Sequence, residues 1–419
     1  MSKAGMFFRG LAAGGVALFM AVAAQANVTV PGIFTDNMVL QRGVPVPVWG
    51  LAEPKERITV TFMKQKQVVE TDETGFWFVK LDALTEEPTG QTLVVDGKNT
   101  LTFKNVVVGD VWICSGQSNM EWALGGCNAP EDIKTADLPQ IRQIKVAHDT
   151  AGQPLTKWSK GAEWTVCSSK TAANFTAVGF YFARRINQDV KVPVGLVNVN
   201  WGGTRIEPWT ASEGLSLIAD QEALVKKYSE ALPAFNKNLE PRLAAMEKWL
   251  AEARAAVQGN TFMPPMPEMP VPAYQQMPHA LYNAMIRPMV PFAIKGVIWY
   301  QGEANGGEGE EEYFNKMKAL IGGWRAVWKQ NDFPFYSVQL ANFGTPAKTP
   351  AADEGYARVR MAQARALSMP KTGLAVTIDI GEFDNIHPRN KFDVGNRLAL
   401  WALHDEYGKA DVVPSGPLY

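Results

Sequence analysis

The chain has 419 residues, of which 46% are hydrophobic and 20% are charged, and its formal net charge is −1. A chain of this length usually folds as two or three domains, and the apolar content is sufficient for a normal core. The near-neutral charge argues against nucleic acid or an anionic membrane surface as the main partner.

The N-terminal segment has the pattern of a secretory signal peptide. Lys3 and Arg9 give a positive start, and Leu11–Ala24 is an apolar run too short to span a membrane comfortably. Ala24–Ala26 has the small-x-small pattern of a cleavage site. We expect residues 1–26 to be removed, with export to the periplasm or the extracellular space and no membrane attachment afterwards. The alternative is a membrane anchor.

Residues 27–107 are predicted to form a small all-β sandwich. Short apolar runs are separated there by Gly, Pro, Asp and Asn, which is typical of short strands joined by turns. The segment contains no convergent acid, base or nucleophile. Trp77 and Phe78 are candidates to bind sugar, but core packing is the favoured interpretation. The expected strands are residues 44–49, 58–62, 76–79 and 92–95.

From residue 108 to about 412, strands alternate with helices, which predicts an α/β domain with a mostly parallel sheet. An insertion at about 215–280 interrupts it. Residues 220–257 have the spacing of one or two amphipathic helices, and residues 261–277 form a Met- and Pro-rich loop or arm. The expected strands are residues 106–113, 192–199, 294–300, 335–340 and 374–378, and the expected helices are residues 175–186 and 393–407.

Polar clusters follow four of these strands at the point where each strand ends. Ligands bind at the carboxyl edge of the strands in open α/β sheets, so the coincidence of four clusters is a stronger signal than any one of them. The clusters are Gly116–Asn119, Trp201–Thr204, Gln301–Glu303 and an acidic loop after residue 378.

Ser118 is the candidate nucleophile. A nucleophilic serine needs a sharp strand-to-helix turn that exposes its hydroxyl, and Gly116 permits close backbone approach at such a turn. The second glycine of the familiar Gly-x-Ser-x-Gly elbow is absent, because Met120 stands in its place. The alternative is that Ser118 caps a helix, and this motif alone does not decide between the two.

His387 is the candidate base among the four histidines, the others being His148, His279 and His404. It lies on a loop after a strand, three residues after Asp384. A carboxylate at that position can orient the imidazole and stabilise its cation, so Ser118, Asp384 and His387 form a possible triad. The alternative for Asp384 and His387 is a solvated turn.

Acyl transfer also requires oxyanion donors. Gly202 and Gly203 offer backbone N–H groups, or else form only a tight turn. Gln301 and Asn305 offer side-chain amides, or else Gln301 is a satisfied core amide. The candidate substrate-binding residues are Gln117, Asn119, Arg205 and Glu303. Arg205 would contact a carboxylate unless it forms a salt bridge, and Trp209 would contact a sugar face unless it is a core residue.

The three cysteines and the histidines do not have the spacing of a zinc site, and we expect neither a metal nor a cofactor. Cys114 lies in an apolar run and is expected to be a small core residue. Cys127 and Cys167 either pair or remain thiols, since an exported protein meets an oxidising compartment.

These motifs resemble the sialate O-acetylesterase family, a branch of the SGNH hydrolases. The matching segments are Gly109–Trp122, Trp201–Trp209, Leu281–Ile286, Gly296–Asn305 and Asp384–Lys391. The resemblance implies a three-layer α/β/α hydrolase domain that follows the small β-sandwich. By motif position it makes Ser118 the nucleophile, His387 the base and Asp384 its partner. It places the oxyanion donors at the Ser118 backbone, the Gly202–Gly203 turn, and an amide in Gln301–Asn305.

Two departures from the family pattern concern the third motif block and the chain's end. The Gly-x-Asn core of the block is replaced by Gln301–Asn305, which leaves the amide donor open between those two residues. Family members continue past a segment like Ser415–Tyr419 into more β structure, so a shortened form is expected.

The resemblance implies hydrolysis of O-acetyl esters on a sugar or glycan, with sialate as the expected substrate. An acetylesterase of xylan or another plant polysaccharide is the alternative enzyme. A non-catalytic carbohydrate-binding protein is the alternative of another class. The oligomeric state is left open.

Overall fold

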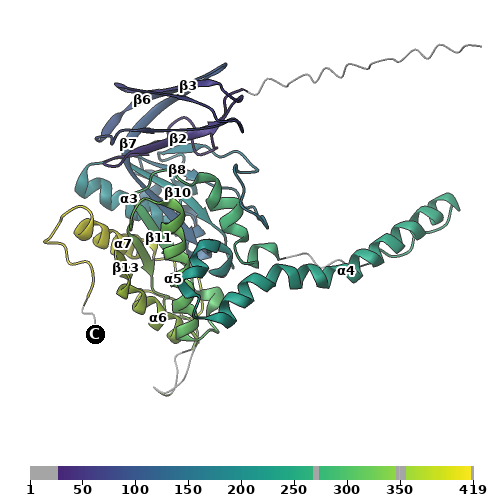
Figure 1. The fold of residues 1–419 in the computed structure, drawn as a ribbon. Coiled ribbons are helices and arrows are strands. Elements are labelled where there is room, and N and C mark those ends of the chain that lie inside the picture. Colours follow the sequence, from purple (N-terminus) through teal and green to yellow (C-terminus); the bar gives the residue numbers. More distant parts are fainter. Residues whose placement is uncertain (1–26, 268–272, 346–348, 350–354, 417–419) are drawn as a thin grey trace, which may run out of the picture.

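The computed structural model describes residues 27–267, 273–345, 349 and 355–416 (Figure 1). The predicted signal peptide therefore lies outside the described residues, as do residues 268–272 of the Met- and Pro-rich arm and the last three residues of the chain.

The N-terminal part is the expected β-sandwich. β2 pairs with β5 in one sheet, and β4, β3, β6 and the first half of β7 pair in order in the other. Residues in β3 and β5 alternate between buried and more exposed positions, as expected where one face of each sheet meets the core. Trp77 is buried in that core, as the favoured interpretation predicted. The strands are β1 (Val39–Gln41), β2 (Val46–Leu51), β3 (Arg57–Phe62), β4 (Gln65–Glu70), β5 (Phe76–Leu81) and β6 (Glu87–Asp96).

A single strand, β7 (Thr100–Gly116), joins the sandwich to the α/β part. Its first half pairs antiparallel with β6, and its second half pairs parallel with two strands of the central sheet. The first half is partly exposed, whereas every residue from Val106 to Gly116 is buried. The predicted boundary between residues 107 and 108 thus falls inside one continuous strand, where its surroundings change.

The central sheet has the strand order β13-β12-β11-β7-β10-β8-β9. Its pairs are parallel except β8 with β9. The carboxyl ends of β7, β10 and β11 therefore meet at one edge, as the polar clusters predicted. The strands not yet given are β8 (Leu138–Lys145), β9 (Trp164–Cys167), β10 (Val194–Asn200), β11 (Gly296–Tyr300), β12 (Phe335–Val338) and β13 (Thr372–Ala375).

Helices cover both faces of this sheet and give the three-layer α/β/α arrangement (Figure 1). On one face, Trp112 of β7 packs edge-on against Phe182 of α3, and Tyr336 of β12 packs against Trp401 of α7. On the other face, Trp299 of β11 packs against Trp324 of α5. The helices are α1 (Ser118–Glu121), α2 (Pro130–Lys134), α3 (Ala177–Val190), α4 (Glu222–Gln258), α5 (Glu310–Trp328), α6 (Gly355–Arg365) and α7 (Lys391–Asp405).

The insertion forms one long helix, α4, which extends away from the body of the molecule (Figure 1). It contains Pro233 and Pro241, and only Leu224, Tyr228 and Ala253 of its residues are buried.

Within the described ranges, no helix is long and apolar enough to cross a membrane.

Candidate active site

Ser118 lies at the sharp turn between β7 and α1, directly past the carboxyl end of the strand. The turn depends on Gly116, whose φ is +135°. A Cβ at this position would lie 2.1 Å from the carbonyl oxygen of Tyr300 in the neighbouring strand, so a side chain is excluded. The glycine therefore lets β7 turn while it stays paired with β11.

The hydroxyl of Ser118 is 2.8 Å from Nε2 of His387. Ser118 is the first residue of α1, and the cap position is Gln117, so the hydroxyl is directed to a base rather than used as a helix cap. The imidazole stacks on Trp122, with ring centroids 4.9 Å apart and planes 23° from parallel. The structure thus brings together the predicted nucleophile and the predicted base.

The structure does not bring Asp384 to His387, which corrects the predicted triad. Asp384 is exposed, and no hydrogen bond joins it to the imidazole in the described part of the chain. The reason is local: the loop closes instead through Asn385, whose Oδ1 accepts the backbone N–H of His387 and whose Nδ2 donates to Glu382. The two residues therefore form a Ser–His pair.

Asn119 connects the nucleophile turn to the histidine loop. Its Nδ2 donates to Oε1 of Glu303 at 2.5 Å and to the carbonyl oxygen of Ile386 at 3.0 Å. Its Oδ1 accepts from the buried ammonium of Lys391, at the start of α7. One amide thereby fixes the two segments that carry Ser118 and His387.

Burial sets the protonation behaviour of this network. It lowers the pKa of His387 below its ordinary value, and the positive charge of Lys391 lowers it further. Burial also lowers the pKa of Lys391 to about 8, against the opposing attraction of Glu303, and raises the pKa of Glu303. The base is therefore held neutral at neutral pH, the state in which it accepts a proton.

The Gly202–Gly203 turn lies against Ser118, since a Cβ at Gly202 would be 3.3 Å from the Cβ of Ser118. The Gly202 N–H is occupied, because it donates to the Glu121 carboxylate at 2.7 Å. The N–H groups of Gly203 and Ser118 donate to no acceptor among the described residues. These two groups, rather than Gly202, are the backbone donors left for an oxyanion.

Glu121 also contacts Nε2 of His148 at 3.0 Å, and His148 stacks on Trp201 with ring centroids 4.2 Å apart. Burial opposes ionisation of Glu121, but the hydrogen bonds from His148 and Gly202 outweigh it and hold its pKa below the ordinary value. Sequence reasoning did not assign a role to Glu121 or His148. His148 follows β8, so the same strand-end rule that located the other clusters would have found it.

The predicted amide donors are both engaged in the interior, which corrects their assignment to the oxyanion hole. Nε2 of Gln301 donates to Gln117, Thr204 and Asn305, and its Oε1 accepts from Tyr313. Nδ2 of Asn305 donates to two carboxylates, those of Glu207 and Glu308. Gln301 is thus the satisfied core amide of the alternative interpretation.

The four candidate substrate-binding residues hold the scaffold instead. Gln117 is buried and accepts from Gln301 and from the backbone of Gly302 and Ala304. Asn119 and Glu303 belong to the network described above. Arg205 pairs with Glu207 and Glu308.

The partners of Arg205 form a buried ionic cluster with Lys316. Burial opposes the charge on Glu207, but Lys316 and Arg205 outweigh it and lower its pKa to about 2. Trp209 is fully buried, with its indole N–H on Thr204, so it is a core residue and not a sugar platform.

The three cysteines are buried thiols, so Cys127 and Cys167 remain unpaired in this structure. Over the described ranges, no group of three or more His, Cys, Asp or Glu side chains is arranged to hold a metal ion.

A Ser–His pair at the carboxyl edge of a parallel sheet, between two helical layers, is the arrangement typical of hydrolases of the three-layer α/β/α class. A family model described as carbohydrate esterase, sialic acid-specific acetylesterase, matches residues 108–246 and 255–404. The chain therefore belongs to the sialic acid-specific acetylesterase family of carbohydrate esterases.

Individual relatives agree with this membership. The sialate O-acetylesterase of Rattus norvegicus is 29% identical over 92% of this chain and 75% of its own length. The sialate O-acetylesterase of Homo sapiens is 28% identical over 91% of this chain and 72% of its own length. The crystal structure of a carbohydrate acetylesterase from Xanthomonas citri, 36% identical, superposes with a TM-score of 0.74 and covers 91% of this chain and 76% of that one.

Proposed function

We propose that this chain is an exported carbohydrate O-acetylesterase that hydrolyses O-acetyl esters of sialic acid through an acetyl-serine at Ser118. The observation that carries the proposal is the 2.8 Å contact between the Ser118 hydroxyl and Nε2 of His387, beside the N–H groups of Ser118 and Gly203, which have no acceptor within the part of the chain that the structure describes. Nucleophile, base and oxyanion donors are the parts that acyl transfer requires.

In the first half of the reaction, Oγ of Ser118 attacks the acetyl carbonyl carbon while Nε2 of His387 takes the hydroxyl proton. The carbonyl oxygen becomes an oxyanion, which the N–H groups of Ser118 and Gly203 stabilise. The ester bond then breaks, and the imidazolium gives its proton to the departing sugar hydroxyl. Ser118 is left acetylated.

In the second half, His387 removes a proton from water, which attacks the acetyl-serine. The collapse of the second tetrahedral intermediate releases acetate and returns the proton to Oγ of Ser118. Trp122 and the Asn119 hydrogen bond to Ile386 hold the imidazole in position throughout, in the place of a carboxylate partner.

Family membership and the names of the relatives support an acetylated sugar as substrate. One observation favours the alternative of a neutral acetylated polysaccharide such as acetylxylan. Arg205, the residue expected to recognise a sugar carboxylate, is held by Glu207 and Glu308. The intact Ser118–His387 contact speaks against a non-catalytic carbohydrate-binding protein.

Export rests on the sequence of residues 1–26 alone. If these residues are a signal peptide, the mature protein secreted from an expression host should begin at Asn27, as N-terminal sequencing would reveal.

The function is tested by acetate release from O-acetylated sialic acid and from acetylxylan. The wild type should have a higher kcat/KM for O-acetylated sialic acid than for acetylxylan. Ser118→Ala should lower that kcat/KM at least about 10³-fold. Ser212→Ala, an exposed serine bonded to Glu213, is the matched control and should keep full activity. A preference for xylan would favour the alternative substrate, and full activity of Ser118→Ala would overturn the mechanism.

A further inference from the structure

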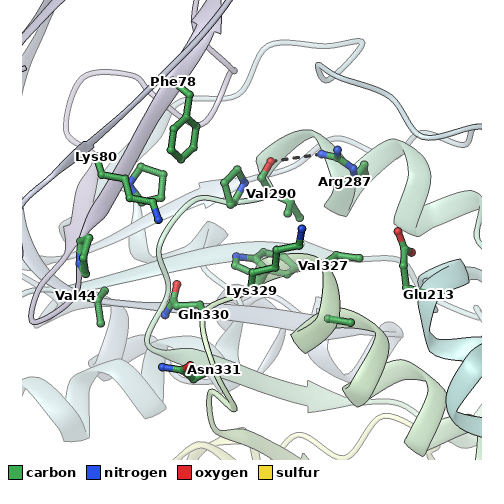
Figure 2. A pocket seen from close by; sticks show the side chains of 15 residues that line it. Val44, Phe78, Lys80, Glu213, Arg287, Val290, Val327, Lys329, Gln330 and Asn331 are labelled. Carbon is green, nitrogen blue, oxygen red and sulfur yellow. Dashed lines mark hydrogen bonds between the residues drawn. The ribbon is translucent and has the colours of Figure 1, made fainter. Parts of the chain in front are cut away.

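A cavity of about 700 Å³ lies between the β-sandwich and the catalytic part. One wall comes from the sandwich, through Val44, Pro45, Pro47, Phe78 and Lys80. The other comes from Arg287, Val290 and Pro291, which precede β11, and from Lys329–Asn331, which follows α5 (Figure 2). We call it the interdomain pocket.

The interdomain pocket is separate from the active site. It opens beside the start of β11, whereas Ser118 lies at the edge where β11 ends. Five residues of strand at about 3.3 Å each place roughly 17 Å between the two edges. A small ligand in the pocket therefore does not contact the Ser–His pair.

The pocket carries three cationic side chains, Lys80, Arg287 and Lys329, against one acidic one, Glu213. None of the three cations forms an ion pair with any residue that the structure describes. The Arg287 guanidinium reaches only the carbonyl oxygen of Val290, at 3.5 Å, and Nζ of Lys80 lies 5.9 Å from the centre of the Phe78 ring. In Figure 2 the ammonium groups of Lys80 and Lys329 enter the space from opposite walls.

An adjoining pocket provides a contrast. It shares Val44, Gln330 and Asn331 with the interdomain pocket, and it also contains three cations, Arg42, Lys295 and Lys371. Each of these is paired with a carboxylate: Arg42 with Asp110 and Glu86, and both lysines with Glu406. Unneutralised positive charge is therefore a property of the interdomain pocket and not of the adjoining pocket. In a chain of net charge −1 this charge is local.

The remaining wall is apolar. The half-buried ring of Phe78 faces this space, together with Pro45, Pro47 and Pro291. A pyranose ring presents C–H groups to such a surface, while a carboxylate on the ring is attracted to lysine and arginine. An aromatic ring beside unpaired cations suits a ligand that combines both properties.

We propose that the interdomain pocket binds a carboxylate-bearing oligosaccharide. The identification of the ligand as a sugar rests on the proposed function, since it is the esterase activity that brings glycans to this chain. The pocket would hold one part of an acidic glycan while Ser118 acts on another. The resulting gain in affinity applies to polymeric substrates, because only they reach both sites.

The test is calorimetric titration of Ser118→Ala with a tetramer of unacetylated sialic acid, which binds without being hydrolysed. The tetramer should bind, and reversal of both charges in Lys80→Glu/Lys329→Glu should weaken its affinity about 10-fold or more. Phe78→Ala should weaken it as well. Lys371→Glu, in the adjoining pocket, is the matched control and should bind as tightly as the parent. A neutral cellotetraose of the same length should bind at least about 10-fold more weakly.

Kinetics separates this inference from the proposed function. With Ser118 present, Lys80→Glu/Lys329→Glu should raise KM for an acetylated oligosialic acid and leave kcat for 4-nitrophenyl acetate unchanged. Three outcomes would overturn the inference: no binding by the parent, equal binding by the charge-reversed variant, and equal binding of cellotetraose. If the tetramer binds as expected but Ser118 proves not to be the nucleophile, the pocket stands and the proposed function fails.

Discussion

The Glu121 carboxylate accepts a 2.7 Å hydrogen bond from the backbone N–H of Gly202, and so fixes the glycine turn that lies against Ser118. Because the turn also carries the Gly203 N–H, Glu121→Ala should displace an oxyanion donor. We expect kcat/KM for an acetyl ester to fall about 10- to 100-fold. His148→Ala should cost less, since the Gly202 bond remains. Glu131→Ala, at an exposed position on α2, is the control. A folded Glu121→Ala variant with kcat/KM within twofold of wild type would refute this role.

Asn119→Ala should lower kcat about 10- to 100-fold with little change in KM, because the side chain joins the Ser118 turn to the His387 loop. The variant should also lose about 1–3 kcal/mol in free energy of unfolding, since it leaves buried polar groups without partners.

Asn390→Ala is the control for a loss of stability alone. Asn390 caps α7 through the Asp393 N–H, and its loss should cost about 1 kcal/mol but no activity. Equal kcat values for Asn119→Ala and Asn390→Ala, at matched unfolding midpoints, would show that Asn119 does not position Ser118 and His387.

The pH dependence should report His387. Protonated imidazole cannot accept the Ser118 proton, so activity is lost as pH falls through the pKa of His387. Burial and Lys391 lower that pKa, so kcat/KM should rise with pH to a plateau through a midpoint below 6.5. Lys391→Met removes the nearby cation and should move the midpoint upward. A wild-type midpoint above 6.5, or no shift in the variant, would contradict this assignment.

Arg205→Met should affect stability and not substrate choice. The guanidinium is about one-third exposed but is paired with two buried carboxylates, so we expect a loss of about 1–3 kcal/mol in free energy of unfolding, less than for a fully buried pair. The ratio of kcat/KM values for acidic and neutral acetylated sugars should stay constant. A selective loss of kcat/KM on the acidic sugar would show that Arg205 contacts the substrate.

The sequence predicted the parts of the site that depend on strand ends and backbone. The strands before Ser118 and Gly202 are mostly apolar and buried where they enter the sheet, and parallel pairing brings their carboxyl ends together. His387 followed from the small number of histidines and a loop position. Gly116 was predicted to allow close approach, and its contact with Tyr300 is of that kind.

What the sequence did not predict concerns the direction of side chains. Asp384 has suitable spacing from His387, but the loop closes through Asn385 and Glu382. Gln301 and Asn305 have suitable chemistry for oxyanion donors, but buried acceptors satisfy them. Spacing along the chain does not reveal the competition at Gln301 and Asn305, because acceptors such as Thr204 and Glu207 come from distant segments.

The central claim is that Ser118 is a nucleophile activated by His387. The most direct measurement is intact-mass spectrometry after incubation with a fluorophosphonate, followed by peptide mapping. We predict one adduct per chain, located on Ser118, with labelling strongly slowed in His387→Ala and unchanged in Asp384→Ala. An adduct at another residue, or acetate release by a wild-type chain that is not labelled at Ser118, would contradict the account.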